Sequence, residues 1–235
     1  MGFMNTVALS ENAGNRLKEH LRGKGYELIE IRRTDAVYEA VSAHPDIYLC
    51  KICGELVVAP ALVPQIRDEL LRRGINYHQG DGDLGYRYPE NIRYNAAQVG
   101  RHLIHDTRHT DPAILDIARE HGMKLVPVKQ GYTKCNLVVV DDNSVITSDR
   151  GLAAAMEKHG IEVLQITHGH VGLPGFPYGF LGGASGKVGC EIVFNGNLSA
   201  HPDFERIRGF IGEKGLDVIW FEEYPLEDVG SIIQL

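Results

Sequence analysis

Cysteine, histidine and lysine side chains concentrate in two segments of this chain. Cys190 ends the segment THGHVGLPGFPYGFLGGASGKVGC, which also carries His168 and His170. A cysteine thiolate is a strong nucleophile, and a neighbouring base or cation lowers the pKa of its thiol. We therefore consider Cys190 as a candidate nucleophile and the two histidines as its candidate bases. In the second segment, GYTKCN, Lys134 precedes Cys135 and can lower the pKa of that thiol in the same way.

Each of these residues also has a purely structural interpretation. Cysteine is commonly a small buried side chain, and histidines of a polar loop are commonly solvated. His168 and His170 lie on one side of an extended segment, where they can bind a metal or carry protons. Cys50 and Cys53 have the spacing of half a zinc site, but a structural zinc site needs four ligands and the other two cysteines stand singly. We expect no metal and no other cofactor.

The segment GGASGK, residues 182–187, superficially resembles a phosphate-binding loop. That motif needs a glycine and a hydroxyl residue where this chain has Leu181 and Val188, and it needs a helix where a strand is expected here. The backbone NH groups of the segment can instead bind a carboxylate, with Lys187 as the countercharge. A tight turn is the structural alternative.

The composition is that of a globular protein without a membrane segment. The 235 residues carry 31 acidic and 24 basic side chains, for a formal charge of -7, which argues against a nucleic-acid partner. The chain contains no apolar run of about 18 residues, and MGFMNTVALSENAG lacks a basic region followed by an apolar one. Four cysteines are too few for a disulfide framework. These features predict a cytoplasmic protein, and they leave its oligomeric state open.

An internal repeat must position the candidate residues. Five times, a helical pattern ends in a basic or histidine residue and a glycine, and a short apolar run follows. Glycine ends a helix in the left-handed conformation, and a cation before it complements the helix dipole. Helix ends are therefore predicted at Lys24-Gly25, Arg73-Gly74, His121-Gly122, His159-Gly160 and Lys214-Gly215.

Two strand-like runs joined by a turn precede each helix except the first. The runs are DIYLCKI and ELVVAP, IRYNAA and HLIHDT, CNLVVV and VITS, and CEIVF and NLSA, of which the last two are joined by Asn195-Gly196. The first unit has only NTVALS before its helix, whereas GSIIQL at the other end of the chain has no helix after it. Pairing of GSIIQL with NTVALS would close a ring and remove the exposed sheet edges.

We predict an α/β fold, a single domain of five ββαβ blades closed by the C-terminal strand. The predicted blades are residues 1–31 plus 229–235, 45–79, 90–128, 134–166 and 187–221. The connections between blades then emerge together near the axis at one end. The connection at residues 167–188 is longer than most loops of compact domains, and its apolar residues predict an ordered lid.

This organisation resembles the pentein fold of the guanidino-group-modifying enzymes, with the segment from Glu90 to Gly151 most similar to dimethylarginine hydrolases. The resemblance implies attack of a thiolate on a guanidinium carbon, proton transfer by a histidine, and carboxylates that hold the cation. The fold also includes a non-catalytic ribosome anti-association factor.

The catalytic positions of these enzymes match this chain less well than the fold does. The position of the family histidine falls at Tyr132-Thr133, where no histidine stands, and the acidic position falls near Glu90-Asn91. The nucleophile of the family follows a Gly-Gly pair, which here is Gly182-Gly183, with Cys190 at a longer spacing.

Two functions follow from these observations. The first is binding of a small polar ligand, amino-acid-like or guanidino-like, in an axial cavity, with hydrolysis of an amidine through Cys190. The alternative is a non-catalytic pentein that docks a macromolecule. For the first function, Cys190 is expected to share the cavity with Cys135. The predicted ligand-binding residues of this cavity are Glu90, Asn91, Asn95, Lys134, Cys135, Asn136, Ser185 and Lys187.

Overall fold

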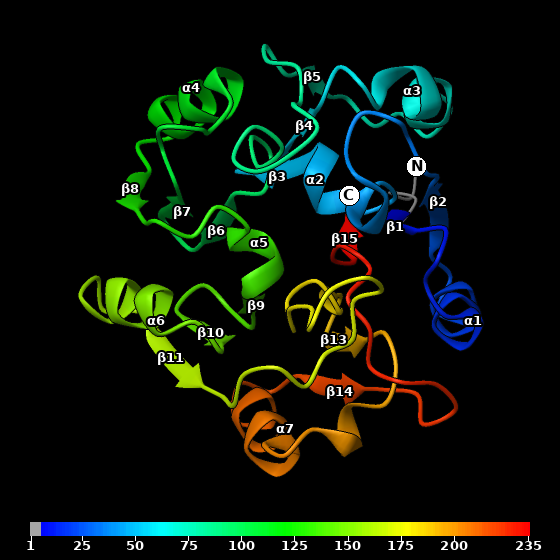
Figure 1. The fold of residues 1–235 in the computed structure, drawn as a ribbon, viewed down its shortest axis with the longest axis vertical. Helices are drawn as coiled ribbons and strands as arrows, with labels where there is room; N and C mark the ends of the chain where they lie inside the picture. Colours follow the sequence, from blue (N-terminus) through cyan, green and yellow to red (C-terminus); the bar gives the residue numbers. More distant parts are fainter. Residues whose placement is uncertain (1–5) are drawn as a thin grey trace.

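The computed structural model describes residues 6–235 and arranges them as five small sheets around a common axis (Figure 1). In every sheet the central strand pairs antiparallel with one neighbour and parallel with the other. The helix between the central and the parallel strand lies on the outside of the ring. This is the predicted five-bladed α/β arrangement.

The blades, numbered from the N-terminus, contain the following strands and helices. Blade 1 contains β15 (Ile233–Gln234), β1 (Thr6–Ser10), α1 (Asn15–Gly23) and β2 (Glu27–Ile31). Blade 2 contains β3 (Leu49–Ile52), β4 (Glu55–Val58), α3 (Val63–Arg72) and β5 (His78–Gln79). Blade 3 contains β6 (Ala97–Val99), β7 (His102–His105), α4 (Pro112–Glu120) and β8 (Lys124–Pro127). Blade 4 contains β9 (Val138–Val139), β10 (Ser144–Thr147), α6 (Arg150–Glu157) and β11 (Glu162–Gln165). Blade 5 contains β12 (Ser185–Val188), β13 (Glu191–Phe194), α7 (Phe204–Glu213) and β14 (Asp217–Ile219).

Short helices precede three of the blade elements. They are η1 (Glu39–Val41) and α2 (Pro45–Tyr48) before β3, α5 (Thr133–Asn136) before β9, and η2 (Leu198–Ala200) before α7. All but η2, which lies within blade 5, belong to connections between blades. In Figure 1, α2 and α5 lie near the centre of the ring, unlike the long helices. None of the helices in residues 6–235 is long and apolar enough to cross a membrane.

The glycines that were predicted to end the long helices do so. Gly25 follows α1 with φ +86°, and a residue with a side chain would be strained there. The buried residues Leu17 and Leu21 face inward from α1, one helical turn apart. Such apolar faces, packed against the sheets, explain why each repeat needs its neighbours.

The C-terminal strand closes the ring. Ile233 pairs with Ala8 and Gln234 with Val7, antiparallel, so that β15 completes blade 1. The prediction that GSIIQL pairs with the N-terminal strand is confirmed, although Asn5 of that strand lies outside the described residues, as does the rest of 1–5. The first strands also approach each other closely: a Cβ on Gly186 would lie 2.0 Å from the carbonyl oxygen of Ile232.

The predicted hairpin of blade 5 is wrong by one strand. The segment EIVF forms the second strand, β13, and the first strand is SGKV, which was expected to be loop. The turn lies at Gly189-Cys190, where Gly189 has φ +59°, instead of at Asn195-Gly196. The segment NLSA forms a short helical turn, η2. Both glycines permit a turn, and packing of β12 against the closing strand β15 selects the first.

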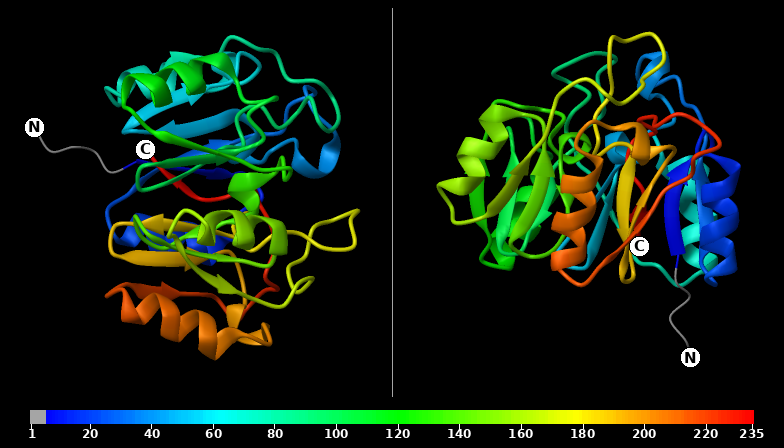
Figure 2. Two further views of the ribbon diagram at one scale, coloured as in Figure 1. Left: turned by 90° about the vertical axis from the view of Figure 1, so that its left-hand side faces the viewer. Right: turned by 90° about the horizontal axis from the view of Figure 1, so that it is seen from below.

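The connections between blades gather at one end of the ring, which we call the loop end. The right-hand view of Figure 2 shows the segment of residues 167–184, drawn in yellow, standing above the strands at this end. The hairpin turns that join the first and second strands lie at the other end, which we call the turn end. Any ligand site formed by the interblade connections must therefore lie at the loop end.

Candidate functional site

Cys190 does not share a cavity with Cys135. Cys190 is exposed, and it lies in the turn after β12, at the turn end of that strand. Cys135 is buried in α5, and its carbonyl oxygen accepts a hydrogen bond from Gly183 N, before β12 begins. Because the two thiols lie beyond opposite ends of β12, the expected shared cavity is wrong.

The two candidate bases also lie elsewhere. His168 is exposed and packs against Tyr178, with ring centres 4.1 Å apart. His170 is exposed and packs against His201, at 5.3 Å. Both belong to the loop end, so neither is positioned to deprotonate Cys190 in its turn.

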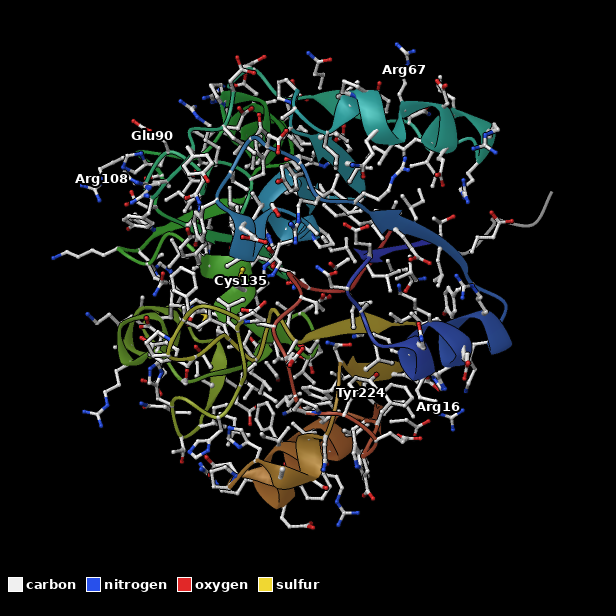
Figure 3. The ribbon with its side chains drawn as sticks, turned by 45° about the vertical axis from the view of Figure 1, so that its right-hand side comes forward. Arg16, Arg67, Glu90, Arg108, Cys135 and Tyr224 are labelled. Carbon is white, nitrogen blue, oxygen red and sulfur yellow. The ribbon has the colours of Figure 1, made fainter. Side chains whose placement is uncertain are left out.

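The loop end instead brings together six buried polar side chains, which we call the axial cluster. They are His44, Asp46, Asn95, Cys135, Asp228 and Ser231. Asp46 lies in α2 and Cys135 in α5, and both helices immediately precede the first strand of a blade. Figure 3 shows Cys135 in the interior of the ring and Glu90 at its periphery. The pseudo-symmetry of the ring therefore directs equivalent positions of different blades toward one point.

Cys135 and Asp46 form the centre of this cluster. The Cys135 thiol donates a hydrogen bond to Asp46 Oδ2 at 3.0 Å, and the Ser231 hydroxyl donates to the same oxygen at 2.6 Å. Asn95 Nδ2 donates to Cys135 Sγ at 3.1 Å. Asp46 Oδ1 is buried and has no hydrogen-bond partner within residues 6–235. A carboxylate oxygen is therefore left free beside a thiol.

Asp228 supplies a second buried carboxylate. Its Oδ2 accepts from Phe180 N at 2.9 Å, and its Oδ1 accepts from Gly230 N at 3.0 Å. The Nδ1 of His44 lies 3.7 Å from Asp228 Oδ1 and, in the described part of the chain, makes no hydrogen bond. A Cβ on Gly183 would lie 2.0 Å from Asp228 Oδ1, so only glycine allows this approach.

The electrostatics of the cluster follow from burial. Burial raises the pKa of Asp228 to about 6 and also raises the pKa of Asp46. Burial lowers the pKa of His44 to about 4, so this imidazole is neutral at pH 7. Burial, reinforced by the nearby Asp46, raises the pKa of the Cys135 thiol well above its usual value. No lysine or arginine of residues 6–235 forms an ion pair with Asp46 or Asp228.

A cavity of about 640 Å³ borders this cluster. His44 and Asp228 line the cavity, whereas Asp46 and Cys135 do not. Tyr38 and Phe176 form part of its wall, with ring centres 5.6 Å apart, so the long connection covers the cavity as a lid would. Arg33 and Glu39 form an ion pair at 3.0 Å among the lining residues. We call this cavity the loop-end pocket.

The other predicted ligand-binding residues have different environments. Glu90 is exposed. Asn91 is buried and accepts from the Tyr132 hydroxyl at 3.1 Å, while Asn136 donates to the Tyr132 carbonyl oxygen at 2.8 Å. The hydroxyl of Ser185 donates to the Gly182 carbonyl oxygen at 3.3 Å. These contacts hold the loops that surround the axial cluster.

Lys134 and Lys187 line a different cavity, described below. Of the eight predicted ligand-binding residues, the structure thus brings Asn95 and Cys135 into the axial cluster. His44, Asp46, Asp228 and Ser231 were not predicted from the sequence. Their signal is positional, because each lies just before or at the start of a first strand, as Cys135 does.

Five such blades, with polar residues from the interblade connections gathered on the axis, define a protein of the pentein fold. The chain belongs to a family of unknown function, DUF6873, whose family model matches residues 8–233. No curated protein matches the chain significantly.

Solved structures of guanidino-modifying enzymes share the fold. The dimethylarginine dimethylaminohydrolase of Pseudomonas aeruginosa, in complex with citrulline, is 11% identical over 94% of this chain and 93% of its own, with a TM-score of 0.60. The agmatine deiminase of C. jejuni is 9% identical over 100% of this chain and 94% of its own, with a TM-score of 0.58. An amidinotransferase of the saxitoxin pathway of Microseira wollei is 9% identical over 93% of this chain and 88% of its own, with a TM-score of 0.59.

The raised thiol pKa predicts unequal reactivity of the cysteines. Iodoacetamide reacts with the thiolate, so at pH 7 we expect Cys135 to be alkylated at least about tenfold more slowly than the exposed Cys190. Peptide mass spectrometry over time measures both rates, and urea-unfolded protein, in which the rates should converge, is the control. Equal rates in the folded protein would contradict the assignment of Cys135 as a buried, protonated thiol.

Proposed function

We propose that the protein binds a small amidinium or guanidinium cation in the loop-end pocket and hydrolyses it with Cys135 as the nucleophile. The observation that carries this proposal is the pair of buried carboxylates, Asp46 and Asp228, without a lysine or arginine partner in residues 6–235. Buried carboxylates cost free energy unless they are paired. A planar cation with several N–H groups can hydrogen-bond both.

The cation also activates the thiol. In the empty site, burial and the Asp46 carboxylate disfavour the thiolate of Cys135. A bound cation offsets both effects and lowers the thiol pKa, so that the nucleophile forms only when the substrate is present. Asp46, which already accepts the hydrogen bond of this thiol, is the group that takes its proton.

The reaction then proceeds in two balanced halves. The Cys135 sulfur forms a bond to the amidinium carbon, and the C–N bond to the departing nitrogen breaks as that nitrogen receives the proton held by Asp46. Water next attacks the same carbon, neutral His44 takes one of its protons, and the C–S bond breaks as the second water proton returns to the sulfur. The proton on His44 then passes to the released ammonia or amine. One amidinium and one water thus give one amide or urea and one ammonium or amine.

The names of the structural neighbours support the substrate class. They include a hydrolase of dimethylarginine and a deiminase of agmatine, and both substrates carry a guanidino group. The chain departs from the resemblance at Tyr132-Thr133, where it lacks a histidine. In the proposed arrangement His44, from another connection, supplies the imidazole.

The test combines binding with turnover. Calorimetry and an ammonia or amine assay on acetamidine, methylguanidine, agmatine, arginine and dimethylarginine should identify a ligand. Cys135→Ala should retain its binding and lose turnover by roughly a thousandfold or more. Cys190→Ala, which removes the exposed thiol instead, should leave both unchanged.

Each result bears on a different part of the proposal. Turnover that survives Cys135→Ala would contradict the nucleophile, whereas binding without turnover in the wild type would reduce the function to ligand capture. The absence of any saturable cation would contradict the whole proposal and favour the docking of a macromolecule.

A further inference from the structure

A second axial cavity, of about 310 Å³, lies between the first strands of the five blades. We call it the strand channel. One side chain near the end of each first strand lines it, and these five form a ring: Gln234, Lys51, Gln98, Val139 and Lys187. Lys51 and Lys187 occupy equivalent positions, since each is the third residue of a four-residue strand whose other residues are buried.

Lys134 adds a third ammonium group to this channel. It precedes Cys135 in α5, but its side chain lines the strand channel, whereas Cys135 faces Asp46. No residue of the axial cluster lines the strand channel, whereas His44 and Asp228 line the loop-end pocket. The Asp46 carboxylate acts to raise the pKa of Lys134, but burial lowers it by more, and the two side chains form no ion pair. The charge of Lys134 is therefore not neutralised by direct contact.

The channel has hydrogen-bond donors in excess. Lys51 Nζ donates to the Gln234 carbonyl oxygen and Lys187 Nζ to the Val140 carbonyl oxygen, both at 2.8 Å. Each ammonium carries three N–H groups, so each retains two. Lys134 Nζ makes no hydrogen bond to any group in residues 6–235, and no aspartate or glutamate lines the cavity. Three ammonium groups thus face a cavity without a countercharge.

We propose that the strand channel binds a small multivalent oxyanion, such as a phosphate or a dicarboxylate. Three cations without a lining carboxylate favour an anion of more than one charge, and the remaining N–H groups match acceptors that are all oxygen. The volume lies at the lower limit for small-molecule sites, which excludes a nucleotide-sized ligand. The site is independent of the proposed amidine site, because its residues and the sign of its charge are different.

Burial gives this anion a measurable consequence. The pKa values of Lys51 and Lys134 are both lowered, mainly by burial. A bound oxyanion offsets that effect and stabilises the charged ammonium groups. The anion should therefore stabilise the folded protein as well as bind to it.

The experiment measures binding of inorganic phosphate, pyrophosphate and succinate to the full chain by calorimetry and by thermal unfolding. We expect one saturable site for at least one of the three, with an affinity that falls as salt rises. Lys134→Met and Lys187→Met should each weaken binding by about tenfold or more, because each removes a charged hydrogen-bond donor. Lys158→Met, an exposed lysine outside the channel, is the matched control and should have no effect.

The binding measurements can support or overturn the anion site. Binding of none of the three anions, or binding unchanged in both channel variants, would overturn the proposal. Circular dichroism of each variant separates lost binding from lost folding, and Lys187→Arg, which keeps the charge, should retain most of the affinity. Asp228→Asn should leave anion binding unchanged, so failure of the amidine site and failure of this site are distinguishable.

Discussion

Deletion of residues 230–235 is expected to abolish cooperative folding. The deletion removes β15 together with Ile232 and Ile233, which are 2% and 7% exposed. Two such buried side chains together contribute about 4–10 kcal/mol, which is comparable to the whole stability of a domain. It also leaves β1 as an unpaired sheet edge. Thermal unfolding followed by circular dichroism measures the result.

Two controls distinguish loss of the strand from loss of its side-chain contacts. Gln234→Ala keeps β15 but removes the oxygen that accepts from Gly189 N, and it should cost about 1 kcal/mol. A synthetic peptide of residues 229–235, added to the truncated chain, should restore the transition. If the truncated chain alone unfolds within a few degrees of the wild type, the ring does not depend on its C-terminal strand.

Asp228→Asn is expected to weaken binding of a guanidinium ligand by roughly tenfold to a hundredfold, the effect of losing a charged hydrogen bond. The reason is that Asp228 is the buried carboxylate that lines the loop-end pocket directly. Calorimetry measures the affinity, with any ligand found in the panel above. Glu39→Gln is the matched control, because Glu39 lines the same pocket but is exposed and paired with Arg33.

The pH dependence of the same binding gives an independent check. With a pKa of about 6, Asp228 is mostly protonated at pH 5 and mostly ionised at pH 7. A guanidinium keeps its charge over this range, so its affinity should rise by about tenfold from pH 5 to pH 7 and then level off. His44, with a pKa of about 4, stays neutral throughout, and the raised pKa of Asp46 acts in the same direction.

Asp228→Asn should flatten this pH profile as well as lower the affinity. Because an asparagine has only one acceptor oxygen, it cannot accept from both Phe180 N and Gly230 N, so the unfolding temperature must be measured at each pH. A variant that is folded and binds with the wild-type pH profile would contradict the role of Asp228 in holding the cation.

The sequence by itself determined the architecture of this protein. A basic or histidine residue and a glycine mark the end of each long helix, and Gly25 and its equivalents all adopt positive φ. These signals are local, because helix termination depends on a few adjacent residues. The first repeat lacks its first strand, and GSIIQL has no helix after it, so pairing of these two segments was the consistent way to close the ring. The pairing of Ile233 with Ala8 confirms it.

Local signals were insufficient where two segments offered the same turn. Gly189 and Asn195-Gly196 both permit a hairpin, and the sequence favoured the second. The choice is made by Gly186, whose missing side chain lets β12 approach the carbonyl oxygen of Ile232. That contact joins residues 46 positions apart. The mistaken turn placed Cys190 at the loop end, whereas in the structure it lies at the turn end.

Only the tertiary structure decided which side chains meet on the axis. Asp46 and Cys135 are 89 positions apart, and Ser231 reaches Asp46 across 185. Whether such residues face the axis depends on where each first strand begins, and a shift of one residue would turn a side chain to the other face. Lys134 and Cys135 are neighbours in sequence, yet Lys134 lines the strand channel, whereas the Cys135 thiol donates to Asp46 within the axial cluster. The alignment of the first strands across the five blades exists only in the packed ring. It cannot be read from the sequence of any single repeat.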